Sequence, residues 1–139
     1  MKVEVLFLII LVIILFFLAL FAISFIYYNQ KVLNSKKQFK QEKFEALNPT
    51  MPKGAVVFVG DSHTENFLVH DHFPRINVVN RGISGDTAKD LSNRVEKTVI
   101  PLKPSKIFLM IGTNDLYAGD SVDDVFANVL KIFEIIQSS

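Results

Sequence analysis

Cysteine is absent from this chain of 139 residues, and histidine occurs only at His63, His70 and His72. Without cysteine the chain can form no disulfide, offer no thiolate ligand to a metal and use no cysteine nucleophile. The absence leaves the redox compartment open, because proteins without disulfides occur on both sides of membranes. The formal net charge of +1 gives no reason to expect nucleic acid or another acidic polymer as a partner.

Apolar residues are concentrated near the N-terminus. Residues 5–28 read VLFLIILVIILFFLALFAISFIYY, with no charged residue and a single serine. At a rise of about 1.5 Å per residue, a helix of this length spans the roughly 30 Å hydrocarbon core of a bilayer. Tyr27 and Tyr28 stand where an interfacial aromatic belt is expected. Residues 1–28 are therefore predicted to form a single-pass transmembrane anchor.

A cleaved signal peptide is the alternative interpretation of this segment. Ala22 and Ser24 form a small-x-small pair of the kind that signal peptidase accepts. The apolar run is longer than the roughly 7–15 residues of a signal-peptide core, which favours an uncleaved anchor. By the positive-inside rule, the lysines that follow the run place the rest of the chain in the cytoplasm. Those lysines are Lys31, Lys36, Lys37, Lys40 and Lys43, against Lys2 before the run.

The polar segment after the anchor is interpreted as a juxtamembrane stalk over residues 29–52. Its first part, residues 29–48, is rich in lysine, glutamine and glutamate, which is typical of a solvated spacer that could also be helical. Pro49 and Pro52 interrupt any helix and mark a domain boundary. Residues 53–139 then form the third predicted region.

This third region alternates strand and helix patterns, which favours an α/β fold with a parallel sheet and right-handed crossovers. Short apolar runs predict strands at residues 55–59, 76–79 and 106–111. Helices are predicted over residues 65–69, after a cap at Asp86 or Thr87, and after Ser121. The last helix has one apolar face at helical spacing, formed by Val122, Val125, Phe126, Val129, Ile132, Phe133 and Ile136.

Small polar residues follow each of the three predicted strands. The segments are Gly-Asp-Ser-His at 60–63, Asn-Arg-Gly-Ile-Ser-Gly-Asp-Thr at 80–87 and Gly-Thr-Asn-Asp at 112–115. The carboxyl ends of parallel strands meet at one edge of a sheet, where ligands bind. There Ser62 would present its hydroxyl at a helix N-terminus. The N–H groups of Ser62 and Gly85 and the Asn114 carboxamide would supply three donors to a developing oxyanion.

These segments resemble the three N-terminal motif blocks of the SGNH hydrolase family, also called GDSL esterases and lipases. The matching residues are Gly-Asp-Ser at 60–62, Ile-Ser-Gly-Asp-Thr at 83–87 and Gly-Thr-Asn-Asp at 112–115. The resemblance implies a flavodoxin-like three-layer α/β/α fold, and hydrolysis of a carboxylic ester or thioester. It implies Ser62 as nucleophile and Gly85 and Asn114 as oxyanion donors, without a metal or organic cofactor. Asp61 and Asp115 are predicted to support these loops by hydrogen bonding rather than to act as acids.

The resemblance covers residues 55–139, which correspond to the front part of such a domain with about three strands. The family places its catalytic acid and base in a later Asp-x-x-His block, and no Asp-x-x-His occurs in this sequence. The chain is therefore expected to be truncated before that block. None of the three histidines is expected to replace the missing base, and Arg81 is expected at the surface.

Two functions from different classes are compatible with these residues. The first is a membrane-anchored serine esterase acting on small-molecule, lipid or glycan esters. The second is a catalytically inactive membrane protein that uses the retained oxyanion donors as a binding surface. Enzymes of this family are frequently exported, which opposes the orientation predicted from the lysines and leaves the side of the membrane open.

Overall fold

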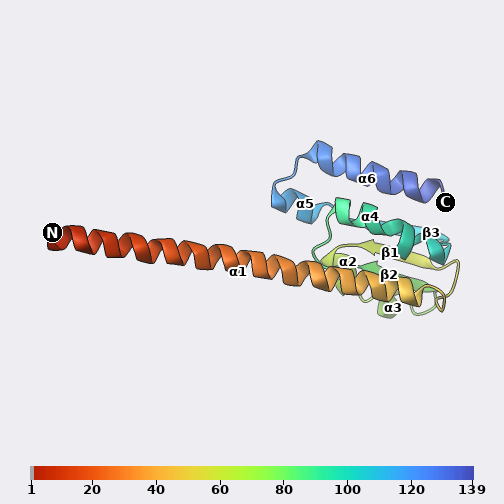
Figure 1. Cartoon of the computed structure of the whole chain (residues 1–139). Helices are drawn as coiled ribbons and strands as arrows, with labels where there is room; N and C mark the ends of the chain where they lie inside the picture. Colours follow the sequence, from red (N-terminus) through yellow and green to blue (C-terminus); the bar gives the residue numbers. More distant parts are fainter. Residues whose placement is uncertain (1) are drawn as a thin grey trace. The chain divides into compact units, whose positions relative to one another are not determined.

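The structure, a computed structural model, describes residues 2–139. Two compact units are distinguished, Met1–Lys36 and Lys37–Ser139, and the helix α1 (Val3–Leu47) runs from the first into the second (Figure 1). No glycine or proline interrupts α1, and it ends just before the Asn48-Pro49 pair, where helical conformation is disfavoured. Its apolar N-terminal stretch is long enough to cross a membrane, and none of that stretch is buried.

The end of α1 differs from the solvated spacer that its composition predicts. Residues from Lys37 onward belong to the second compact unit, and the Phe44 side chain is buried. The Arg81 guanidinium lies 4.6 Å from the centre of the Phe44 ring, a cation–π contact. The amide of Asn48, just beyond the helix, donates to the Lys97 carbonyl at 2.7 Å. The predicted polar segment is therefore partly a packing element of the folded unit.

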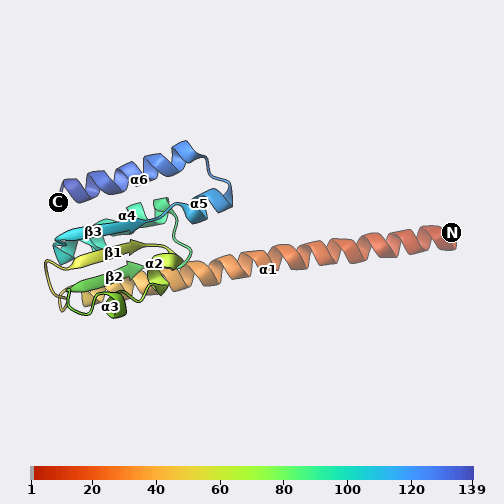
Figure 2. The ribbon, with the colours of Figure 1, turned by 180° about the vertical axis from the view of Figure 1, so that it is seen from behind.

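The second unit contains a parallel sheet of three strands, β1 (Val56–Gly60), β2 (Val78–Gly82) and β3 (Lys106–Met110). The strand order is β2-β1-β3, as seen from behind in Figure 2. The predicted α/β class with a parallel sheet is confirmed. The register pairs Gly60 with both Gly82 and Met110, so the three carboxyl ends lie level with one another.

Two long helices, α4 (Ala88–Thr98) and α6 (Val122–Gln137), cover one face of this sheet (Figure 1). Both begin where the sequence predicts. Thr87 caps α4 through a capping box with Asp90, and the Ser121 side chain accepts from the Asp124 N–H. The shared core is aliphatic and consists of Ala55, Val57, Val59, Val79, Leu91, Val95, Val99, Leu102 and Ile132. Of the predicted apolar face of α6, only Ile132 is fully buried, and Phe126 remains 60% exposed.

The shorter elements depart from the sequence prediction in three places. The helix predicted over residues 65–69 is two short helices, α2 (Ser62–Asn66) and α3 (Val69–His72), which are separated by an extended Phe67. The second strand begins later than predicted and continues through Gly82, because its ladder to β1 extends to Gly60. Between the third strand and the helix after Ser121, where the sequence predicts no element, lies a short helix, α5 (Thr113–Ala118).

Candidate active site

The three motif segments meet at the carboxyl edge of the sheet. The Ile83 N–H donates to the Gly60 carbonyl at 3.0 Å, which joins the loop after β2 to the end of β1. The Asn114 carboxamide donates to the Asp86 carbonyl at 2.8 Å, which joins the loop after β3 to the loop after β2. The structure therefore brings the three predicted segments together through direct hydrogen bonds.

Ser62 is the first residue of α2, and its side chain lies at a cavity of about 790 Å³. Phe58, Phe67, Phe108 and Met110 form much of the apolar lining. The turn from β1 into α2 is tight. A side chain on Gly60 would place its Cβ 2.0 Å from the Met110 carbonyl oxygen, so only glycine fits there. The sharp turn sets Ser62 directly above the sheet edge.

Asp61 caps α2 and is almost completely buried. Its Oδ1 accepts from the His63 N–H at 2.9 Å and lies 3.2 Å from the His63 imidazole Nδ1. Its Oδ2 is buried without a hydrogen-bond partner among residues 2–139. Asp61 thus caps the helix that begins with Ser62, and its supporting role in the site stays a prediction.

Asp115 has a comparable supporting role on the next loop. Its carboxylate is buried, and both oxygens lie 2.9 Å from the Ala88 N–H at the start of α4. This bond stabilises an N–H that has no partner within the helix itself. Asp115 therefore holds the loop after β3 against the helix that follows the Gly85 loop.

Gly85 adopts a left-handed backbone conformation with φ +78°, which favours glycine. Its neighbours in the loop all have partners for their N–H groups. Ile83 donates to Gly60, Ser84 to Glu65 and Asp86 to Ile83. Within the described residues the N–H groups of Gly85 and Ser62 make no hydrogen bond, and both residues are half-buried. Two free N–H donors therefore remain in the segments that follow β1 and β2.

The buried Arg94 side chain on α4 forms hydrogen bonds with the ends of β1 and β2 and with the loop after β2. This residue was not among those predicted from the sequence. Its guanidinium donates to Asp86 at 2.6 Å, to the Arg81 carbonyl at 2.9 Å and to the Gly60 carbonyl at 3.4 Å. Burial raises the pKa of Asp86 above its ordinary value, although the Arg94 charge acts in the opposite direction. A charged residue on the same helical face as Leu91 and Val95 is the sequence signal that could have identified it.

Arg81 is buried, which corrects the surface position predicted for it. Its Nε donates to the Thr98 carbonyl at 3.1 Å and its Nη2 to the Asn48 carboxamide oxygen at 2.9 Å. Burial and the nearby Arg94 charge lower the pKa of Arg81 to about 10. The sequence does not indicate this burial, because the covering residues come from the end of α1, more than thirty positions earlier.

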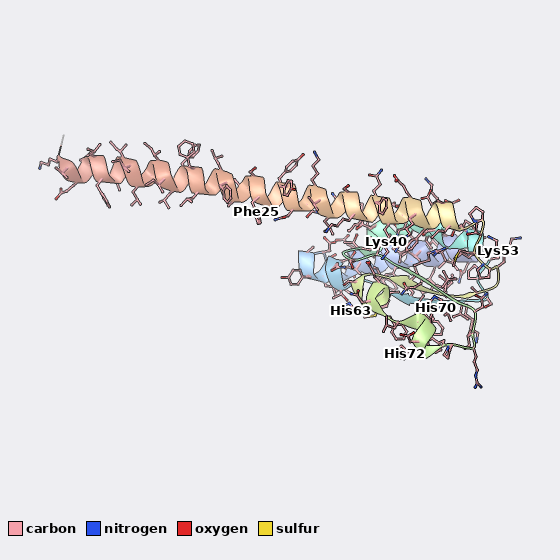
Figure 3. The ribbon with its side chains drawn as sticks, turned by 90° about the horizontal axis from the view of Figure 1, so that it is seen from below. Phe25, Lys40, Lys53, His63, His70 and His72 are labelled. Carbon is pink, nitrogen blue, oxygen red and sulfur yellow. The ribbon has the colours of Figure 1, made fainter. Side chains whose placement is uncertain are left out.

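The three histidines, labelled in Figure 3, lie on two short helices, His63 on α2 and His70 and His72 on α3. The His72 ring stacks on Phe67 at 4.8 Å between ring centres. Among residues 2–139 no histidine makes a hydrogen bond to Ser62. In the same part of the chain, no three His, Asp or Glu side chains are grouped as metal ligands would be. The described residues thus supply a hydroxyl and donors without an adjacent base.

Comparisons with known proteins agree with this geometry. A family model described as the GDSL-like lipase/acylhydrolase family matches residues 58–139. An acetylxylan esterase of Geobacillus stearothermophilus is 52% identical over 42 residues, which are 30% of this chain and 19% of that protein. A solved Streptococcus pneumoniae structure, whose name refers to platelet activating factor, is 27% identical with a TM-score of 0.74. The aligned part covers 78% of this chain and 52% of that one.

A solved GDSL-like lipase from Bacteroides thetaiotaomicron is also 27% identical, with a TM-score of 0.64, over 70% of this chain and 53% of that chain. The chain thus spans about half the length of these solved structures. The matched region contains all three motif segments and the whole sheet edge that they form. Both the family match and the parallel sheet support the same assignment: this chain belongs to the GDSL-like lipase/acylhydrolase family.

Proposed function

We propose that this protein is a membrane-anchored serine esterase in which Ser62 is the nucleophile. The Gly85 N–H, the Ser62 N–H and the Asn114 carboxamide are the proposed oxyanion donors. The observation that carries the proposal is the pair of free N–H groups on Ser62 and Gly85. The N–H groups of their neighbours His63, Ser84 and Asp86 have partners. A free donor at a half-buried site is costly unless a ligand or a reacting group uses it.

The proposed reaction is acyl transfer. The Ser62 Oγ attacks the ester carbonyl carbon, the hydroxyl proton passes to a histidine base, and the carbonyl oxygen becomes an oxyanion held by the three donors. The alcohol leaves with that proton, and water then releases the acyl group from Ser62. The resemblance assigns the base to an Asp-x-x-His block, which does not occur in these 139 residues. The proposed reaction therefore requires a histidine that the described residues do not supply.

Two further parts of the proposal concern the substrate and the domains. The partial identity to an acetylxylan esterase supports a small acyl ester, such as a glycan acetyl ester, as substrate. The proposed regions are an anchor at 1–28, a connecting segment at 29–52 and a hydrolase region at 53–139. The apolar N-terminal stretch of α1 supports the anchor. If it is an anchor, the purified chain should remain with liposomes through alkaline carbonate extraction, and release into the supernatant would contradict it.

The test of the chemistry is hydrolysis of p-nitrophenyl acetate by the full chain in detergent. Any hydrolysis that the chain shows should be abolished by Ser62→Ala and left unchanged by Ser138→Ala, which alters an exposed serine at the end of α6. Where Ser62-dependent hydrolysis is observed, Asn114→Ala should lower kcat about 100-fold or more through loss of one oxyanion donor. Equal rates for the unaltered chain and Ser62→Ala would contradict Ser62 as the nucleophile of this chain.

A binding role is the second candidate, and the absence of any histidine bonded to Ser62 among residues 2–139 favours it. The free N–H groups would then recognise a carboxylate or acyl carbonyl without cleaving it. Acetate should shift the amide resonances of Ser62 and Gly85 while p-nitrophenyl acetate is not hydrolysed. Acetate shifts together with Ser62-dependent hydrolysis would support the esterase instead.

A further inference from the structure

A series of contacts connects α1 to the loop that carries Gly85. The Glu65 Oε2 accepts from the Ser84 N–H at 2.5 Å, immediately before Gly85 in the chain. The Glu65 Oε1 forms an ion pair with the Lys40 ammonium on α1. The Lys40 and Glu65 side chains are each 28% exposed, so the pair is partly shielded from water. Figure 3 shows Lys40 on the part of α1 that belongs to the folded unit.

The position of Glu65 is fixed by close packing between α2 and the end of β2. A Cβ on Gly82 would lie 2.2 Å from the Glu65 nitrogen, so the two backbones are in direct contact. Asn80 fastens the same two elements. Its side-chain nitrogen donates to the Thr64 carbonyl at 2.6 Å, and its side-chain oxygen accepts from the Gly82 N–H at 2.8 Å. The Glu65 carboxylate is therefore held in place beside the Ile83–Ser84 backbone.

The charge of Glu65 is maintained by its partners. Partial burial acts to raise the pKa of this carboxyl, but hydrogen bonds from Lys40 and Ser84 outweigh it, and the net pKa lies below the ordinary value. The neighbouring titratable groups are Lys40 on α1, which pairs with Glu65, and His63 on the same short helix. Lys37 is paired with Asp90 on α4. The carboxylate is ionised at neutral pH, and an ionised acceptor forms a stronger bond to an N–H.

From this geometry we infer that Glu65 is a positioning residue for the Gly85 donor, and that Lys40 holds Glu65 in its position. Glu65 accepts from the Ser84 N–H, the Gly60 carbonyl accepts from the Ile83 N–H, and the Ile83 carbonyl accepts from the Asp86 N–H. The Gly85 N–H is then the donor left free in a loop of defined orientation. The catalytic meaning of this role rests on the proposed function, whereas the contacts themselves do not. Residues 37–47 of α1 thereby become part of the site's architecture.

The test is amide NMR of the full chain in detergent micelles, which does not depend on activity. The Ser84 amide shift should titrate with a midpoint below the ordinary glutamate pKa of 4.5. Lys40→Met should raise this midpoint. Lys43→Met, which alters an exposed lysine one turn along α1, should leave it unchanged. Glu65→Gln should abolish the titration and keep an acceptor. Glu65→Ala should speed Ser84 amide exchange on the order of tenfold, because it removes the acceptor of that N–H, and should shift the Gly85 amide resonance.

Core amides of β1 report whether each variant remains folded. If Glu65→Ala unfolds, loss of the Ser84 titration in Glu65→Gln still tests whether Glu65 is the group that titrates. A Ser84 amide that does not titrate, or an equal response to Lys40→Met and Lys43→Met, would overturn the inference. Failure of Ser62→Ala to alter ester hydrolysis would count against the proposed function alone, because the titration of Ser84 would be unaffected. An unchanged Gly85 amide resonance in a folded Glu65→Ala chain would contradict the positioning role of Glu65.

Discussion

The two faces of the sheet differ in how completely they are covered. On the face toward α4 and α6, Val57 and Val59 of β1 are fully buried. On the opposite face, Phe108 and Met110 of β3 remain 54% and 50% exposed, although Phe58 stacks on Phe108 at 4.9 Å between ring centres. Both faces are apolar in sequence. An apolar side chain contributes to the free energy of unfolding only to the extent that folding removes it from water. The face that α4 and α6 cover therefore contributes more to stability than the opposite face.

The largest expected effect concerns the buried ion pair on the covered side. Asp86→Ala leaves the Arg94 guanidinium buried without its carboxylate, and we expect a loss of about 3–5 kcal/mol in the free energy of unfolding. Hydrogen exchange of β1 amides in the full chain measures this loss. The matched control is Asp123→Ala, which removes an exposed carboxylate from α6. A loss of equal size in both variants would show that burial of the pair is unimportant.

A direct contrast between the faces comes from truncating one large side chain on each. Leu91→Ala removes a fully buried side chain, and should cost about 3 kcal/mol of unfolding free energy. Phe108→Ala removes a larger side chain that is half exposed, and should cost less than about 1.5 kcal/mol because less area leaves water on folding. Urea unfolding followed by β1 hydrogen exchange gives both values. A larger loss of unfolding free energy for Phe108→Ala than for Leu91→Ala would mean that the face with Phe58 and Phe108 contributes more to stability.

The helix caps provide a smaller test of the same contrast. Thr87→Ala removes the capping box of α4, whose residues Leu91 and Val95 are buried, and should cost about 1 kcal/mol. Ser121→Ala removes a similar cap from α6, where most side chains of the first turns are exposed. Loss of the second cap should fray the start of α6 and leave β1 exchange nearly unchanged. β1 exchange that accelerated equally in Thr87→Ala and Ser121→Ala would contradict the predicted difference between the two caps.

The smallest expected effect is a pH dependence at the surface of α4. Burial acts to raise the pKa of Asp90, but hydrogen bonds from Lys37 and Thr87 outweigh it and lower the pKa below 3.8. A lowered carboxyl pKa contributes stability above the unfolded value of 3.8, and this stability is lost as pH falls through the folded value. The difference between the unaltered chain and Asp90→Asn should stay below about 1 kcal/mol, because the side chain is partly exposed.

Stability measurements from pH 7 down to pH 3 on both chains provide the check. The difference between them should be constant at neutral pH and should shrink below pH 3.8. A difference that grew as the pH fell would reverse the sign of the linkage. Lys37→Met should reproduce part of the neutral-pH loss, because Lys37 donates to Asp90 at 2.7 Å.

Locally determined features were predictable from the sequence. Thr87 and Ser121 cap the helices that they were expected to cap, since capping depends on residues within one turn. The parallel class followed from the alternation of short apolar runs with helical patterns. The roles of Ser62, Gly85 and Asn114 stay predictions. The structure does place Ser62 at the start of α2, Gly85 in the loop after β2 and Asn114 in α5, in segments that hydrogen bonds join.

Features that depend on distant residues were missed. Arg81 is buried by Phe44 and Asn48, whose contribution cannot be deduced from residues near position 81. Glu65 acquires its role through Ser84 and Lys40, which are nineteen residues after it and twenty-five before it. The break between α2 and α3 occurs at Phe67, whose carbonyl accepts from the Asn80 side chain. Such contacts arise only once the chain has folded.

The glycines of the motif segments have a consequence for what the family signature records. Gly60, in the first matching block, is required because the β3 backbone leaves no space for a side chain. Gly82, directly before the second block, is required because the α2 backbone leaves none either. Neither requirement involves a reacting atom. A descendant that had lost ester hydrolysis would still be under pressure to keep both glycines in order to fold. These glycines are thus required by the backbone fold itself. Finding them in a sequence therefore indicates the fold more directly than it indicates ester hydrolysis.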